Sequence, residues 1–197
     1  MKKFKKAPKI IVITAIIVSL GAIVFGGYAL AWHEYVSATF APFSTALDSL
    51  EMQKDTSEME GWDVSTYKDK EGGGYVFTVA RPPFLEYEGN ISILTPTEVD
   101  FVDGQMIRIS EYLLDLSYYP RDGLYVLRIA DFTSATDPRQ INSLSSTVDK
   151  YGQPLGRHPD DSEEFYQEWL SLHEKFNEPI MEMFDTIRDI FGDDALK

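Results

Sequence analysis

The chain has 197 residues, a formal net charge of −14 and no cysteine, which excludes disulfide bonds, thiol catalysis and a lipid-modified cysteine. All 32 acidic residues lie beyond residue 31, whereas five of the 18 basic residues lie before it, so the part after residue 31 carries −19 and the part before it +5. A body this acidic repels nucleic acid phosphates, and we expect no nucleic-acid binding.

The strongest pattern is an apolar run that begins at Ile10, ends at Ala31 and contains no ionisable side chain. Its 22 residues reach about 33 Å as a helix, enough to cross a hydrocarbon core of about 30 Å. Lysines crowd its N-terminal side, and no basic residue follows until Lys54. The positive-inside rule therefore predicts a cytoplasmic basic tail over 1–9, a transmembrane signal-anchor helix over 10–31 and an extracytoplasmic acidic domain over 32–197.

A cleaved secretory signal is the alternative, because Ala29-Leu30-Ala31 has the small residues that a signal peptidase accepts. The run is longer than the usual apolar core of a signal peptide, about 7 to 15 residues. Tyr28 and Trp32 also stand where an aromatic belt would hold a retained helix at the membrane surface. We favour the anchor, and cleavage after Ala31 would instead give a secreted protein.

After the apolar run, Phe40, Phe43, Leu47 and Leu50 recur at helical spacing. This spacing predicts a helix over residues 41–53, with Pro42 in its first turn. The polar residues that follow, up to Gly61, predict a loop over 51–60.

The middle of the chain is rich in Val, Ile, Tyr and Phe and is punctuated by Gly, Pro, Asn and Asp, which predicts strands. Gly89-Asn90 and Asp103-Gly104 have the composition of two-residue hairpin turns. The predicted strands are 62–68, 74–81, 84–88, 91–94, 99–102, 105–112, 113–119 and 124–132, the last of them a central strand because it is apolar on both faces.

Residues 133–160 contain few large apolar side chains, and we expect a long connection with a short helix over 140–151. A final helix begins near Asp161, which forms a capping box with Glu164. Pro179 predicts a break over residues 177–179. Two apolar stripes at helical spacing flank that break: Phe165, Trp169, Leu172 and Phe176 before it, and Ile180, Phe184, Ile187 and Phe191 after it.

These elements predict an α+β fold, in which an N-terminal transmembrane helix is followed by an antiparallel β-meander packed by N- and C-terminal helices. The mixture of His158, Asp160, Asp161 and Glu163 is the densest set of potential metal ligands. Acidic residues at a helix N-terminus are also favoured by the helix dipole alone, and we prefer that explanation. We expect no cofactor.

Other chemistry has little support in the sequence. His173 begins a near miss of the zinc-peptidase motif, because Asn177 stands where the second histidine belongs. The chain has no nucleophile elbow and no phosphate-binding loop. Tyr118, Tyr119 and Tyr125 could line a groove for a sugar or peptide, although filling the core is the simpler role for such rings.

The functional expectation follows from topology and from the lack of catalytic motifs. We expect a single-pass membrane-anchored interaction domain of the cell envelope, with a protein partner there and more likely no enzyme activity. The alternatives are a secreted ligand-binding protein and a carboxylate-dependent hydrolase, which the abundant acidic residues neither support specifically nor exclude.

Overall fold

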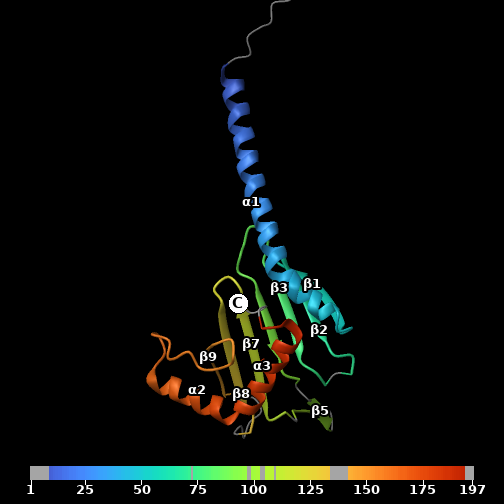
Figure 1. The fold of residues 1–197 in the computed structure, drawn as a ribbon, viewed down its shortest axis with the longest axis vertical. Coiled ribbons are helices and arrows are strands. Elements are labelled where there is room, and N and C mark those ends of the chain that lie inside the picture. The colour runs from blue at the N-terminus through green and yellow to red at the C-terminus, as the bar shows by residue number, and fades with distance from the viewer. Residues whose placement is uncertain are drawn as a thin grey trace, which may run out of the picture.

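The computed structural model describes residues 9–71, 73–96, 99–102, 105–108, 110–133 and 142–193. Within them the chain forms three helices and nine strands (Figure 1). In chain order these are α1 (Lys9–Asp48), β1 (Gln53–Met59), β2 (Trp62–Lys68), β3 (Val76–Arg81), β4 (Asn90–Leu94), β5 (Val99–Val102), β6 (Gln105–Arg108), β7 (Tyr112–Tyr119), β8 (Leu124–Asp131), β9 (Asn142–Val148), α2 (Glu163–Lys175) and α3 (Asn177–Phe191).

Seven strands form one antiparallel meander in the order β1-β2-β3-β4-β7-β8-β9, and β5 and β6 pair separately as a small hairpin. Neighbours in the sheet follow each other along the chain, apart from the β5–β6 excursion. The two C-terminal helices lie across the sheet, with α2 near β8 and β9 (Figure 1). The predicted α+β fold with a meander and flanking helices is therefore confirmed.

Helix α1 has two parts with different surroundings. Its N-terminal part projects away from the sheet with exposed apolar side chains, and its C-terminal part lies on the sheet at a different angle (Figure 1). Pro42 lies inside the helix, where the missing N–H and the ring produce a bend. By length and composition α1 can cross a membrane, a test that a signal sequence near the N-terminus also passes.

The core lies between the helices and one face of the sheet. Side chains alternate between the two faces of each strand, so buried residues recur two positions apart in β2, β3, β4, β7 and β8, on the face that the helices cover. Phe40, Phe43 and Leu47 bring α1 into this core, and α3 contributes Ile180, Met183, Phe184 and Ile187. Trp169 is the largest of the fully buried side chains and comes from α2.

Two predictions about residues 41–60 are wrong. The helix ends at Asp48, not at residue 53, and it is one continuous helix with the apolar run. The predicted loop over 51–60 contains β1, whose seven side chains are all exposed. An edge strand exposed on both faces needs no alternating apolar residues, because its backbone pairing with β2 holds it in place.

The predicted strand over 84–88 and its hairpin at Gly89-Asn90 are also wrong. Residues 82–89 form an irregular connection between β3 and β4, with a turn in which the Glu86 N–H donates to the Pro83 carbonyl at 2.9 Å. Leu85 has a φ of +68°, which a strand does not allow. Phe84 and Tyr87, whose aromatic side chains are typical of strands, pack instead against α1.

The predicted helix over 140–151 is wrong as well, because β9 occupies most of that range and pairs with β8 along its length. Its serines and threonines give little periodic signal. The predicted strand over 105–112 is divided between β6 and β7. The turn at Asp103-Gly104 falls outside the described residues, and the strands on either side pair with Val102 opposite Gln105.

The C-terminal helices agree with prediction in all but the cap. Helix α2 ends at Lys175 and α3 begins at Asn177, with Pro179 in its first turn, which confirms the break. The N-cap of α2 is Ser162, whose hydroxyl accepts from the Phe165 N–H at 3.1 Å, so the capping box at Asp161 and Glu164 is not formed.

Candidate functional site

The candidate functional site is the junction where α1 meets the sheet. A pocket of about 430 Å³ opens there between α1, the start of β2, the end of β3 and the connection after β3. A volume of this size falls within the range of small-molecule sites, about 300 to 1,000 Å³. The residues that give it chemical character are Trp32, His33, Ser37, Asp63, Arg81 and Phe84.

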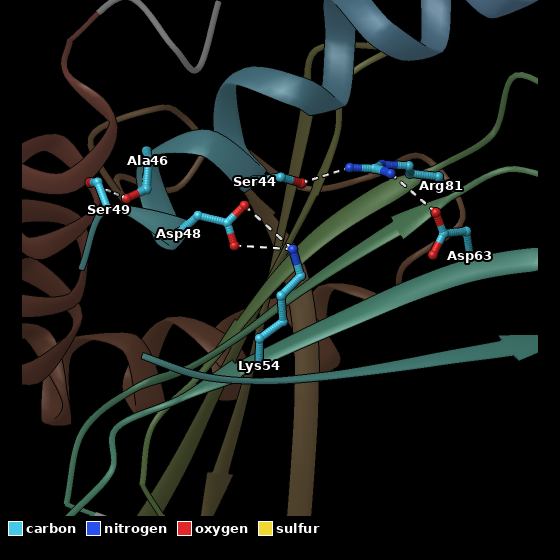
Figure 2. Close-up of polar contacts among 7 residues, drawn as sticks. All are labelled: Ser44, Ala46, Asp48, Ser49, Lys54, Asp63 and Arg81. Carbon is cyan, nitrogen blue, oxygen red and sulfur yellow. Dashed lines mark hydrogen bonds and ion pairs between the residues drawn. The ribbon is translucent and has the colours of Figure 1, made fainter. Parts of the chain in front are cut away.

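Arg81, the last residue of β3, ties the helix to the sheet. Its Nη2 donates to the Ser44 hydroxyl of α1 at 3.0 Å, and its Nη1 lies 3.1 Å from the Asp63 carboxylate of β2 (Figure 2). Ser44 is only 6% exposed, so its hydroxyl needs a partner inside the junction. One guanidinium thus connects three elements, which its fixed fork of donors suits.

A second ion pair lies where α1 ends. Lys54 of β1 places its Nζ 3.0 Å from Asp48 Oδ1 and 3.4 Å from Oδ2 (Figure 2). The same ammonium lies 5.0 Å from the centre of the Tyr67 ring. The Ser49 hydroxyl donates to the Ala46 carbonyl at 2.6 Å, and the Ser49 N–H donates to the same carbonyl at 3.2 Å, so the last turn of the helix is held at its end. Together these contacts fix the direction in which α1 leaves the sheet.

The connection after β3 follows α1 toward the projecting part of the helix. The Trp32 indole Nε1 donates to the Glu86 carbonyl at 2.7 Å, and the Tyr35 hydroxyl donates to the Tyr87 carbonyl at 3.1 Å. Burial raises the pKa of the Tyr35 hydroxyl above its ordinary value. These contacts join residues more than fifty positions apart.

Gly89 allows this close approach. A Cβ built at Gly89 would lie 2.4 Å from Phe40 Cζ and 2.7 Å from the Ala80 carbonyl oxygen, closer than real side chains come. The absence of a side chain there lets the connection lie directly on the buried part of α1. The sequence pattern assigned Gly89 to a hairpin turn, whereas its role is packing.

The junction has the character of a binding site. It combines apolar walls with one guanidinium, one carboxylate and one imidazole. Among the described residues no group of three His, Cys, Asp or Glu side chains could hold a metal ion. Arg81 is already engaged by Asp63, and the pocket residues show no nucleophile hydrogen-bonded to a base.

The predicted ligand set at the start of α2 is dispersed over the surface. His158 Nδ1 lies 3.7 Å from the Asp160 carboxylate, which is almost fully exposed. Glu163 faces Arg157 instead, at 3.6 Å, and Arg157 also donates to the Asp161 carbonyl at 2.6 Å. The structure therefore brings His158 and Asp160 together, whereas Glu163 pairs with the Arg157 guanidinium.

The predicted tyrosine groove is divided between the two faces of the sheet. Tyr118 and Tyr125 are buried and stack with their ring centres 4.7 Å apart, and burial raises the pKa of both. Tyr119 is exposed and points to the opposite face, because successive residues of a strand alternate. Two of the three rings therefore fill the core.

Two other tyrosines line a smaller pocket of about 290 Å³ near the far ends of β3 and β7. Tyr75 and Tyr112 lie there with Glu182 of α3. Burial, with a contribution from the Glu182 charge, raises the pKa of Tyr75 to about 12. No local pattern distinguishes these tyrosines in the sequence, because the residues that surround them are distant in the chain.

His173 is a structural residue. It is buried in α2, where its Nε2 lies 2.8 Å from the Gly152 carbonyl and its ring packs on Trp169. That arrangement leaves the resemblance to a zinc-peptidase motif without a site. Comparison of the chain with protein-family models, with curated proteins and with solved structures finds no match in any of the three.

Proposed function

We propose that the protein is a single-pass membrane-anchored domain of the cell envelope that acts by binding another protein, with its N-terminus in the cytoplasm. The observation that carries the proposal is that α1 is one helix from its exposed apolar part into the core. A domain attached in this way is held close to the bilayer at a fixed angle, whereas a flexible linker would let it drift.

Contacts between residues on the two sides of the possible cleavage position, after Ala31, favour retention of the apolar helix. The Phe25 ring lies 5.9 Å from the Phe84 ring, and α1 runs without a break through Ala29 and Ala31. Cleavage after Ala31 would remove Phe25 and require that part of the helix to unwind. The secreted form remains the alternative.

The orientation rests on charge. The five lysines before the apolar run favour the cytoplasmic side, and the acidic body carries no comparable cluster. An acidic surface facing outward keeps the domain soluble and favours partners that present basic residues.

The exposed edge of β1 is the partner site that we favour. Strand β1 lies at the end of the sheet order and exposes all seven side chains, so an extended segment of a partner can add to it as a further strand. Its charged residues Lys54, Asp55 and Glu58 would discourage nonspecific edge pairing and select a partner with complementary charges.

Membrane fractionation with intact-mass analysis tests the anchor. We expect the full chain in the membrane fraction after alkaline washing, with the mass of residues 1–197. A chain of mass 32–197 in the medium would contradict the anchor and favour the secreted alternative.

Site-specific photo-crosslinking tests the partner site. A photoreactive amino acid at Thr56 of β1 is expected to capture one defined protein in intact cells. The same group at Asp160, which is exposed on another part of the surface, serves as the matched control. Equal capture at both positions, or none at Thr56, would contradict binding at the β1 edge.

Ligand binding is the second candidate, and the 430 Å³ pocket at the junction is the observation that favours it. A thermal-shift screen of the full chain with sugars, peptides and divalent cations tests it. Stabilisation that Arg81→Met abolishes would support a ligand site, and no shift with any compound would count against one.

A further inference from the structure

We infer that the connection between β3 and β4, residues 82–89, is a second membrane contact, whose tip at Phe84 and Leu85 enters the outer leaflet beside α1. This inference rests on the proposed anchoring of α1 and specifies how the domain sits on the bilayer. The connection rises along the projecting part of α1, in green (Figure 1).

The depth of the tip follows from two ring contacts. The Phe84 ring lies 5.9 Å from the ring of Phe25 and 5.2 Å from the ring of Trp32. Phe25 and Trp32 are seven residues apart, about 10 Å along a helix axis. Phe84 therefore lies between them in depth, at the level of the last residues of the apolar run, which ends at Ala31. A bilayer that contains this run also contains the Phe84 ring.

The tip presents apolar surface to its surroundings. Phe84 is 51% exposed and Leu85 is 39% exposed, and the Phe84 ring contacts the exposed Phe25 ring of α1. Leu85 holds a left-handed backbone conformation, with φ at +68°, which is unfavourable for a residue with a side chain. An unfavourable backbone conformation of this kind at a partly exposed residue is typical of functional sites.

The flanks of the tip are held at the height of a membrane surface. Trp32 and Tyr35 donate to the Glu86 and Tyr87 carbonyls, and indole and phenol groups favour the headgroup region. Glu88, further along, lies 3.4 Å from Arg121 of the β7–β8 turn. The Glu88 carboxylate thus lies on the side of the domain, where water is available, and not at the apolar tip.

Lipid is the occupant that the geometry favours over a protein. The exposed surface of the tip is continuous with the apolar run of α1, so whatever surrounds that run also reaches the tip. The body carries −19, and among the described residues the basic side chains next to the connection, Arg81 and Arg121, are paired with Asp63 and Glu88, so insertion depends on apolar contact and not on anionic headgroups.

Spin labelling tests the inference directly, because the chain has no cysteine and each introduced cysteine is unique. Full-length protein in nanodiscs of zwitterionic lipid would carry a nitroxide at Leu85→Cys. Leu20→Cys in the apolar run is the reference for the bilayer, and Asp160→Cys is the reference for water. The measurement compares collision with oxygen, which concentrates in lipid, and with a nickel chelate, which stays in water.

The expected result is that Leu85→Cys resembles Leu20→Cys, with oxygen access high and nickel access at least tenfold below that of Asp160→Cys. The same values are expected in anionic lipid. High nickel access at Leu85→Cys, with Leu20→Cys still shielded, would overturn the inference and leave the anchor intact.

Two other outcomes also overturn it. A Leu85→Cys label shielded from both reagents would show that a protein covers the tip. High nickel access at the Leu20→Cys label would contradict the membrane anchor, and with it the second membrane contact that depends on the anchor. The three labels therefore separate failure of this inference from failure of the proposed function.

Discussion

Arg81 joins α1 to the sheet through Ser44 and Asp63. Replacement by methionine keeps much of the side-chain volume and removes both contacts. It leaves the largely buried Ser44 hydroxyl and the Asp63 carboxylate without this partner. An unsatisfied buried group costs about 1 to 3 kcal/mol.

We therefore expect Arg81→Met to lower the free energy of unfolding by about 1 to 3 kcal/mol, measured by urea denaturation of the full chain in detergent. Arg121→Met is the matched control, because the Arg121–Glu88 pair is exposed on both sides and exposed pairs contribute about 0 to 1 kcal/mol. Equal losses in the two variants would mean that Arg81 does not hold the junction.

Asp115 stands on the face of the sheet opposite the helices, paired in register with Arg128 of β8. Burial raises the pKa of its carboxyl, and the Arg128 charge opposes that rise without cancelling it. Below the pKa that this carboxyl has in the unfolded chain, it is protonated in both states and does not lower the free energy of unfolding. Stability is then lost as the pH rises through the folded pKa.

Asp115→Asn is accordingly expected to raise the melting temperature at pH 7 and to leave it unchanged at pH 3. Calorimetric or circular-dichroism melts at the two pH values check this, and Asp160→Asn on the exposed surface is expected to change neither. A lower melting temperature for Asp115→Asn at pH 7 would mean that the attraction to Arg128 outweighs the cost of burial.

At the scale of elements, the turn after β9 is a short polar segment that contacts both C-terminal helices. The Asp149 carboxylate accepts from the Tyr151 and Gln153 N–H groups, both at 2.8 Å. The Gly152 carbonyl meets His173 of α2, and the Gly152 backbone lies against Phe184 of α3. The turn thus locks β9 to both C-terminal helices.

Gly152→Ala is expected to lower the free energy of unfolding by about 2 to 4 kcal/mol, which combines overpacking with an unfavourable φ of +80°. Its Cβ would lie 2.7 Å from Phe184 Cδ2 and 2.9 Å from Met181 Cε. Gly156→Ala, also at positive φ but with open space around it, isolates the backbone cost of about 1 kcal/mol. Chemical denaturation of both variants measures the two losses in the free energy of unfolding. Equal losses would mean that packing at Gly152 does not matter.

Elements with a strong local pattern were predicted well. The strands at 62–68 and 113–119 and the break before Pro179 follow from alternation, helical spacing and the properties of proline. Strands β1 and β9 escaped prediction because their polar side chains carry no period, and their stability comes from backbone pairing with a neighbour. The junction could be predicted only in part: Trp32 stood out beside the apolar run, but nothing local linked it to Arg81.

At the scale of the whole molecule, the buried core indicates that the residues up to Ala31 are not needed for the domain to fold. Every buried apolar residue lies at or beyond Phe40 among the side chains described. A chain that begins at Trp32 keeps all of them. It loses the Phe25–Phe84 contact and exposes the tip at Phe84 and Leu85.

We expect the chain that begins at Trp32 to unfold cooperatively, with stability close to that of the full protein. A chain that begins at Ser44 loses Phe40 and Phe43, each of which costs about 3 to 5 kcal/mol when removed from a core. We expect that chain to be unfolded, as judged by circular dichroism and urea titration. Cooperative unfolding of the shorter chain would show that α1 is dispensable for the fold.

The sequence alone determined the segregation of charge, the apolar helix, the central strands of the meander and the paired C-terminal helices. Each of these is encoded by a local period or by the absence of a residue type. The tertiary structure decided that the apolar helix continues into the core, that residues 82–89 pack on it and that Arg81 joins the two. Those contacts link side chains such as Trp32 and the Glu86 backbone, 54 positions apart, and depend on which strands become neighbours in the sheet. No periodicity reaches that far, because only the folded chain brings such residues together.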